Sequence, residues 1–128
     1  MIFLETSFLI GFYVKNDKHH KNAIKIWENI NDEKKIINKM TLYEFLTVLR
    51  KKNIKDMDVK KYYNEIINNL IILEDQELHQ QALETCLNNS LGFFDNLHRI
   101  TMLENKITII ASFDTGYDIF EDIERISF

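Results

Sequence analysis

The chain has 128 residues, 45% of them hydrophobic, and carries a formal net charge of −4 at pH 7. This length allows one well-buried core and is too short for two ordinary domains, so we predict a single domain over residues 1–128. The only cysteine, Cys86, excludes an internal disulfide, and no cysteine–histidine cluster has zinc-site spacing. The negative charge argues against a protein that coats nucleic acid through bulk electrostatics.

The first residues carry no targeting signal. They lack the basic segment and small-residue cleavage site of a signal peptide. No apolar run approaches the roughly 18 residues that a membrane-spanning helix needs. We therefore expect a cytoplasmic protein.

The chain begins with a short apolar run, residues 2–4, that stops abruptly at Glu5. Such a run is typical of a buried central strand that ends where polar residues begin. Thr6 or Ser7 is placed to cap a helix that follows over residues 8–13.

Helix, strand and helix follow in the next third of the chain. Apolar residues at helical spacing predict a helix from about residue 20 to 30, and a strand is expected over residues 35–38. Thr41 stands where an N-cap would lie, and Glu44 three residues later completes a capping-box pattern.

The second half continues this alternation. Residues 59–70 give the clearest amphipathic pattern, and residues 70–73 are expected to form a strand. Further helices are predicted over residues 76–88 and 93–103. In the first of these two helices we expect the apolar side chains to be buried, namely Leu78, Ala82, Leu83, Cys86 and Leu87.

The strongest strand pattern covers residues 107–113 and ends at Asp114. A short helical turn near residues 117–121 and a last strand near 125–127 complete the chain. Alternating strands and helices predict an α/β fold, a three-layer α/β/α sandwich around a mainly parallel sheet of four to five strands. Sites in such folds form outside the carboxyl ends of the strands.

Four carboxylates fall at positions that this fold would bring together. Glu5 and Asp114 directly follow strands, while Glu44 and Asp95 lie near the starts of helices. Like charges this close raise one another's pKa unless a cation is bound. All-oxygen ligands select hard cations such as Mg²⁺ or Mn²⁺, whose chemistry with bound water suits phosphodiester hydrolysis.

Each acid also has a simpler explanation. Glu5 and Asp114 are compatible with ordinary strand ends, Glu44 with a capping box, and Asp95 with a favourable charge at a helix start. A phosphotransfer domain of similar architecture is a further alternative, but Glu5 suits a phosphoacceptor poorly and no lysine ends a strong later strand.

Four short motifs resemble those of the PIN-domain proteins, and within them the toxin ribonucleases of VapBC-type toxin–antitoxin systems. They are MIFLETSFLI at residues 1–10, TLYEFL at 41–46, FFDNLH at 93–98, and IIASFD at 109–114 followed by Tyr117 and Asp118. Each motif is weak alone, but their order and spacing cover essentially the whole chain.

The resemblance implies a Mg²⁺- or Mn²⁺-dependent endoribonuclease that forms a homodimer and is neutralised by a cognate antitoxin. It makes Glu5, Glu44, Asp95 and Asp114 the catalytic metal ligands, directly or through water. Thr6 or Ser7 would position a metal-bound water, and Asp118 is an outlying candidate. His98 follows Asp95 by three residues, and a helix-surface histidine or one that supports a ligand is the commoner case there.

One residue departs from the family pattern, because the first motif usually carries Asp and this chain has Glu5. The longer side chain matters at a site where Mg²⁺ tolerates little deviation from octahedral geometry. A PIN fold that binds an antitoxin or RNA without cleaving is therefore the competing hypothesis.

Charge and apolar patterns suggest two further surfaces. Residues 1–61 hold 13 of the 16 Lys and Arg residues. The tightest basic run, led by Arg50, Lys51, Lys52 and Lys55, fits either RNA phosphate contacts or a solvated helix end. Two apolar stripes fit either the core or an interface, and they comprise Tyr62, Ile66 and Leu70, and Phe8, Phe12 and Trp27.

Overall fold

The computed structural model describes residues 1–126 and contains a five-stranded sheet in the order β3-β2-β1-β4-β5. All four strand pairings are parallel. The first and fourth strands along the chain are therefore neighbours at the centre. The strands are β1 (Ile2–Leu4), β2 (Lys35–Asn38), β3 (Ile71–Leu73), β4 (Ile109–Ala111) and β5 (Glu124–Ile126).

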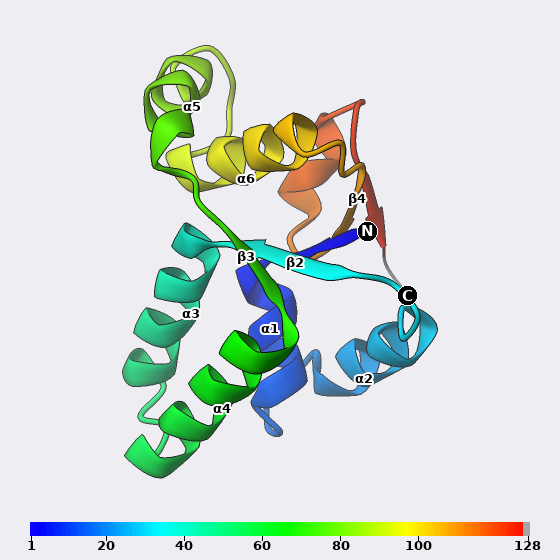
Figure 1. Ribbon diagram of the computed structural model, residues 1–128, viewed down its shortest axis with the longest axis vertical. Coiled ribbons are helices and arrows are strands. Elements are labelled where there is room, and N and C mark those ends of the chain that lie inside the picture. The colour runs from blue at the N-terminus through cyan, green and yellow to red at the C-terminus, as the bar shows by residue number, and fades with distance from the viewer. Residues whose placement is uncertain (127–128) are drawn as a thin grey trace.

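Helices cover both faces of the sheet, which confirms the predicted three-layer sandwich (Figure 1). One layer contains α1 (Thr6–Tyr13), α2 (His20–Asn29), α3 (Lys39–Lys51) and α4 (Asp56–Asn69). The other contains α5 (His79–Cys86) and α6 (Phe93–Glu104), with short 3₁₀ helices η1 (Gln76–Leu78) and η2 (Thr115–Ile119). None of the helices within residues 1–126 is long and apolar enough to cross a membrane.

Side chains of the central strands alternate between the two layers. Leu4 and Ile37 pack into the core beneath α1–α4, whereas Phe3, Ile36 and Ile110 pack into a second core with residues of α6 and η2. Successive side chains in a strand point to opposite faces, so strands buried on both faces need consecutive apolar residues. The short apolar runs in the sequence meet this requirement.

Two helices are capped by different residues from those predicted, in each case by the last residue before the helix. Glu5, not Thr6 or Ser7, is the N-cap of α1, and its side chain accepts a hydrogen bond from the Ser7 N–H. Asn38, not Thr41, is the N-cap of α3 and accepts from the Thr41 N–H. In both cases a polar side chain that leaves a strand satisfies a free N–H of the helix that follows.

The predicted helix over residues 76–88 is interrupted and less buried than expected. It divides into η1 and α5, and only Ala82 among its five predicted apolar positions is fully buried. Leu83 and Leu87 are 50% and 76% exposed, while Leu78 and Cys86 are partly buried. The last strand is found at Glu124–Ile126, and the predicted Ser127 lies outside the described residues.

The two apolar stripes contribute mainly to the core. Phe8, Ile66 and Leu70 are buried. Phe12, Trp27 and Tyr62 are partly buried and pack against the same core cluster. An amphipathic helix that covers a sheet buries one stripe of side chains in this way.

Adjacent residues of α4 allow a test of this packing. Ile66 is fully buried and Ile67 is 43% exposed. Ile66→Ala should lower the free energy of unfolding by about 2–5 kcal/mol, because it leaves a cavity in the core. Ile67→Ala should change it by about 0.5 kcal/mol or less. Urea unfolding measures both, and equal losses would contradict this assignment of the α4 faces.

Candidate functional site

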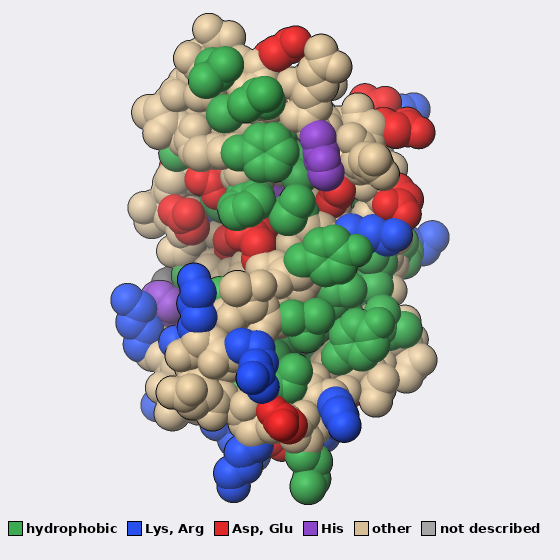
Figure 2. All heavy atoms as spheres, turned by 90° about the vertical axis from the view of Figure 1, so that its left-hand side faces the viewer, with side chains coloured by type: hydrophobic (Ala, Val, Ile, Leu, Met, Phe, Trp, Pro, Cys, Tyr) green, Lys and Arg blue, Asp and Glu red, His purple; other side chains and the backbone are tan. Residues whose placement is uncertain are grey.

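The four acids predicted from the sequence lie where the strands end and helices begin. Glu5 follows β1, and its N–H donates to the Ala111 carbonyl at the end of β4, 3.1 Å away. Asp114 follows β4, while Glu44 and Asp95 lie on α3 and in the first turn of α6. Figure 2 shows the face where β2 ends and α3 begins, and acidic side chains gather near its middle.

Glu5 is held by hydrogen bonds although its carboxyl group is nearly buried. Its side chain is only 7% exposed, and Oε1 accepts hydrogen bonds from the Ser7 N–H at 2.7 Å and the Ser112 hydroxyl at 3.0 Å. Burial raises the pKa of Glu5, and these hydrogen bonds offset part of that effect. The extra methylene of Glu therefore does not prevent this carboxylate from capping its own helix.

Two serines connect β1 to the segment after β4. The Ser7 hydroxyl accepts from the Phe113 N–H at 2.9 Å and lies 3.3 Å from the Ser112 hydroxyl. Ser112 in turn accepts from the Asp114 N–H at 3.0 Å. Together these contacts fix the backbone that carries Asp114 relative to Glu5.

Asp95 is electrostatically coupled to its neighbours. Partial burial raises its pKa, the nearby Tyr117 hydroxyl lowers it, and the charges of Asp114 and Glu44 raise it again. Tyr117 is almost fully buried, and the charges of Glu5 and Asp95 add to the effect of burial in raising its pKa. Asp95 and Tyr117 therefore lie close enough to other acids for those charges to raise their pKa values.

Glu44 belongs to a buried hydrogen-bonded chain. Its Oε1 lies 2.7 Å from His98 Nε2, and His98 Nδ1 lies 3.0 Å from the Asn38 side-chain nitrogen. Asn38 and His98 are 0% and 1% exposed, whereas the side chain of Glu44 is 24% exposed. The chain thus runs from the end of β2 through α6 to a carboxylate that reaches the surface.

The supporting candidates have different surroundings. The Thr6 hydroxyl is buried and makes no hydrogen bond within the described residues. Asp118 is 54% exposed, and both of its carboxylate oxygens accept from Arg125 at 3.0 Å. The structure therefore leaves the buried Thr6 hydroxyl without a partner among residues 1–126 and engages Asp118 in an ion pair.

The donor set fits a hydrated divalent cation better than a fully protein-enclosed one. Within residues 1–126, no group of three or more histidine, cysteine, aspartate or glutamate side chains is positioned to hold a metal ion by itself. Mg²⁺ usually keeps several waters and binds through one or two carboxylates. The carboxylates supply oxygen atoms suited to such an ion.

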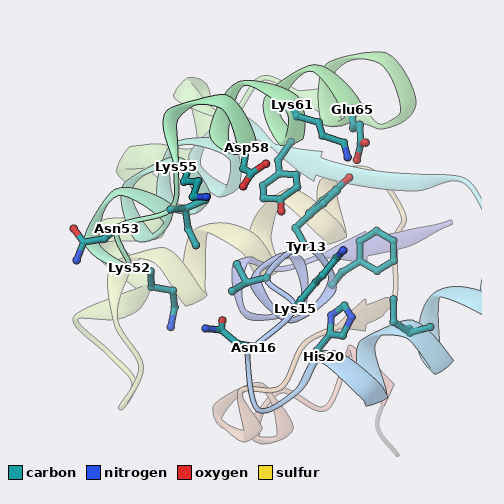
Figure 3. A pocket seen from close by; sticks show the side chains of 15 residues that line it. Tyr13, Lys15, Asn16, His20, Lys52, Asn53, Lys55, Asp58, Lys61 and Glu65 are labelled. Carbon is teal, nitrogen blue, oxygen red and sulfur yellow. The ribbon is translucent and has the colours of Figure 1, made fainter.

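The basic run lies away from the acids. Arg50 is near the end of α3, about 9 Å along the helix axis from Glu44, and it pairs with Asp56 at 2.9 Å. Lys52 and Lys55 line a surface cavity of about 740 Å³ at the opposite end of α1 from Glu5 (Figure 3). The sequence alone did not reveal this separation.

Several side chains around the acids were not predicted as site residues. Asn38 ends a predicted strand, Ser112 lies near the end of another, and Tyr117 was named only as part of the fourth motif. Polar residues at the ends of apolar runs are the signal that would have found Asn38 and Ser112. The contact between Tyr117 and the acids arises from the path of η2 and has no local pattern.

The buried charge of Glu5 has a pH-dependent cost. The pKa of Glu5 is higher in the folded chain than its unfolded value of 4.5. Protonation of Glu5 therefore stabilises the fold below about pH 4.5, and this stabilisation is lost as the pH rises through the folded pKa. Glu5→Gln keeps a cap acceptor without the charge. In EDTA it should raise the Tm at about pH 7, and the gain should shrink towards about pH 4.

Thermal unfolding at both pH values measures this difference. The matched control is Glu28→Gln, an exposed glutamate on α2 that should leave the Tm unchanged. A gain for Glu5→Gln that is equal at the two pH values would contradict the assignment.

Three solved structures are similar in fold. Mycobacterium tuberculosis VapC20, a sarcin-ricin loop cleaving toxin, has a TM-score of 0.84 at 19% identity and covers 97% of this chain and 98% of its own. Rickettsia felis VapBC2, bound to a DNA fragment from their promoter, has a TM-score of 0.73 at 12% identity and covers 98% of both chains. Neisseria gonorrhoeae FitAcB has a TM-score of 0.68 at 11% identity, covering 99% and 97%.

No curated protein matches the sequence. The profile of the PIN domain matches residues 2–125. This match covers almost the whole chain, and it includes all four acids and the strands and helices that carry them. The chain therefore belongs to the PIN-domain family.

Proposed function

We propose that the protein is a Mg²⁺- or Mn²⁺-dependent endoribonuclease that hydrolyses RNA phosphodiester bonds with a metal-activated water. The proposal is supported by the positions of Glu5, Glu44, Asp95 and Asp114 near the carboxyl edge of a PIN-type sheet, where the charges of Asp114 and Glu44 raise the pKa of Asp95. Phosphodiester hydrolysis of this kind needs no covalent nucleophile.

Asp95, Asp114 and Glu44 are the side chains in this proposal that hold the cation, because their charges interact and each is at least partly accessible. The cation would activate water and stabilise charge on the phosphate. Glu5 supports the site from beneath through its bonds to Ser7 and Ser112 and contributes its second oxygen. The Thr6 hydroxyl is available to orient a water.

We further propose that the protein acts as the toxin of a toxin–antitoxin pair. Support comes from the four sequence motifs and from the fold similarity to VapC20, itself a toxin, and to VapBC2. Exposed large hydrophobic side chains also lie on α3, α5 and α6, among them Tyr43, Leu83 and Phe94. Exposed apolar groups of this kind suit an antitoxin or a second copy of the chain.

RNA contacts beyond the acids are assigned to the basic residues. Lys52 and Lys55, together with Lys15 and Lys61, line the cavity at the far end of α1. Phosphates of a longer RNA bound at the acids are the groups that such lysines attract. Arg50 and Lys51 lie on the exposed end of α3 nearby.

Cleavage of a mixed RNA pool tests the nuclease proposal. Protein freed of any antitoxin should cut RNA in Mg²⁺ or Mn²⁺ and not in EDTA. Asp95→Asn should reduce the cleavage rate by more than about 100-fold. Losing a residue that only orients a metal ligand typically costs up to about 100-fold, and a direct ligand should cost more. Intact RNA in every lane would overturn the nuclease and favour a PIN-fold module that binds without cleaving.

Glu5→Asp belongs in the same assay, because it restores the residue usual in the first motif. Asp is a good N-cap, so α1 keeps its cap. Cleavage should be preserved or increased in this variant. A complete loss on Glu5→Asp, with the fold intact by circular dichroism, would count against Glu5 as a ligand.

The proposed homodimer is tested by light scattering. Leu83 is 50% exposed on α5, so Leu83→Glu removes apolar surface without disturbing the core. We expect wild-type protein to have the mass of two chains and the variant that of one. A single-chain mass for wild type at every concentration would exclude the homodimer.

A further inference from the structure

We propose that Asn38 and His98 are positioning residues that fix the Glu44 carboxylate and leave one of its oxygens, Oε2, for the cation. This inference rests on the proposed metal-dependent function and adds two residues that the four motif acids do not include. Asn38, His98 and Glu44 are joined by successive hydrogen bonds, and each bond determines which atom of the next one donates and which accepts.

The first step fixes the orientation of the Asn38 amide. The backbone N–H of Thr41 donates to Asn38 Oδ1 at 2.9 Å, and the Thr41 hydroxyl donates to the same oxygen at 2.7 Å. A backbone N–H is only a donor, so the atom facing it must be the amide oxygen. The Asn38 NH₂ group therefore points away from α3 and towards α6.

The second step fixes the proton on His98. The Asn38 NH₂ lies 3.0 Å from His98 Nδ1 and 3.1 Å from the Thr101 hydroxyl oxygen, and Thr101 donates its own proton to the Leu97 carbonyl. All four hydrogen-bonding positions of Asn38 are then used. Since Nδ1 accepts from an NH₂ group, the ring proton is on Nε2.

The proton on His98 Nε2 is directed at Glu44. His98 Nε2–H donates to Glu44 Oε1 at 2.7 Å, which joins α6 to α3 across the edge of the sheet. The imidazole is 1% exposed and packs against Phe3 of β1, with ring centroids 5.6 Å apart. Both ring nitrogens are occupied, so His98 is a support for a ligand and not itself a ligand.

The remaining oxygen of Glu44 is available. No hydrogen bond from residues 1–126 reaches Oε2, and the side chain is 24% exposed. A carboxylate held through one oxygen presents the other in a fixed direction, which suits an ion that demands near-octahedral geometry. Partners that orient ligands in this way typically contribute 10- to 100-fold in metal affinity or activity.

The tautomer of His98 is directly measurable in the wild-type protein. Long-range ¹H–¹⁵N NMR of the metal-free chain should show His98 with a protonated Nε2 and an unprotonated Nδ1. A proton on Nδ1 instead would overturn the proposed hydrogen bonds from Asn38 to His98 and from His98 to Glu44, whether or not the protein cleaves RNA.

Two amide substitutions separate the two ends of the ring. Gln places its NH₂ as many bonds from Cα as histidine Nε2, whereas Asn places its NH₂ at the position of Nδ1. His98→Gln therefore keeps the donor to Glu44, and His98→Asn removes it. Mn²⁺ titration followed by electron paramagnetic resonance should show about 10- to 100-fold weaker binding in His98→Asn and substantial rescue in His98→Gln.

The results distinguish this inference from the proposed function. Equal Mn²⁺ affinities in wild type and in folded His98→Asn would overturn the positioning role, even if wild type cleaves RNA. Conversely, the protein could show the predicted tautomer and order of Mn²⁺ affinities and yet never cleave RNA. That result would support the positioning role of Asn38 and His98 and overturn the nuclease proposal. Thermal unfolding of each variant in EDTA establishes that it is folded.

Discussion

The parallel pairing of all five strands is the constraint on which the rest of the molecule depends. Parallel neighbours cannot be joined by a tight turn, so the chain crosses back over a face of the sheet before each new strand. Every strand therefore ends at the same edge, and helices begin there. Glu5, Asn38 and Ser112 are gathered because each comes at the end of a strand, although as many as 107 residues separate Glu5 from Ser112.

Gathering carboxylates at one edge costs free energy, and the structure offsets that cost locally. Glu5 accepts hydrogen bonds from the Ser7 N–H and the Ser112 hydroxyl, and Glu44 accepts one from His98 Nε2–H. Asp95 begins a helix, where partial positive charge favours a carboxylate. Burial still raises the pKa of Glu5 and Asp95, so the compensation is incomplete. A bound cation would complete it, which is why stability and the proposed activity are coupled through the same side chains.

Much of this architecture follows from local patterns. The strands at residues 35–38 and 71–73 and the α4 helix were predictable because consecutive apolar residues and helical spacing depend on neighbours in sequence. The caps were misplaced because Glu5 and Asn38 act as both the last residue before a helix and a part of the site. The exposure of Leu83 and Leu87 was missed because a pattern gives the apolar side of a helix and not whether another element covers it. Similarly, the meeting of Tyr117 with Asp95 and of Asn38 with His98 depends on how α6 and η2 pack, which no single segment specifies.

The central position of β1 has a consequence for the synthesis of the chain. β1 is made first but lies between β2 and β4, and Ser7 binds the Phe113 N–H, a partner translated 106 residues later. The ribosome adds about 5–20 residues per second, and domains begin to fold while the chain is still being made. Contacts between residues this distant in sequence form late, because the long loop between them must first be closed. All the residues between Glu5 and Asp114 must therefore leave the ribosome before Glu5, Ser112 and Asp114 can meet. A growing chain that already contains α1–α4 still lacks Asp95 and Asp114, so the acidic centre can assemble only after the segment that carries Asp114 has been made.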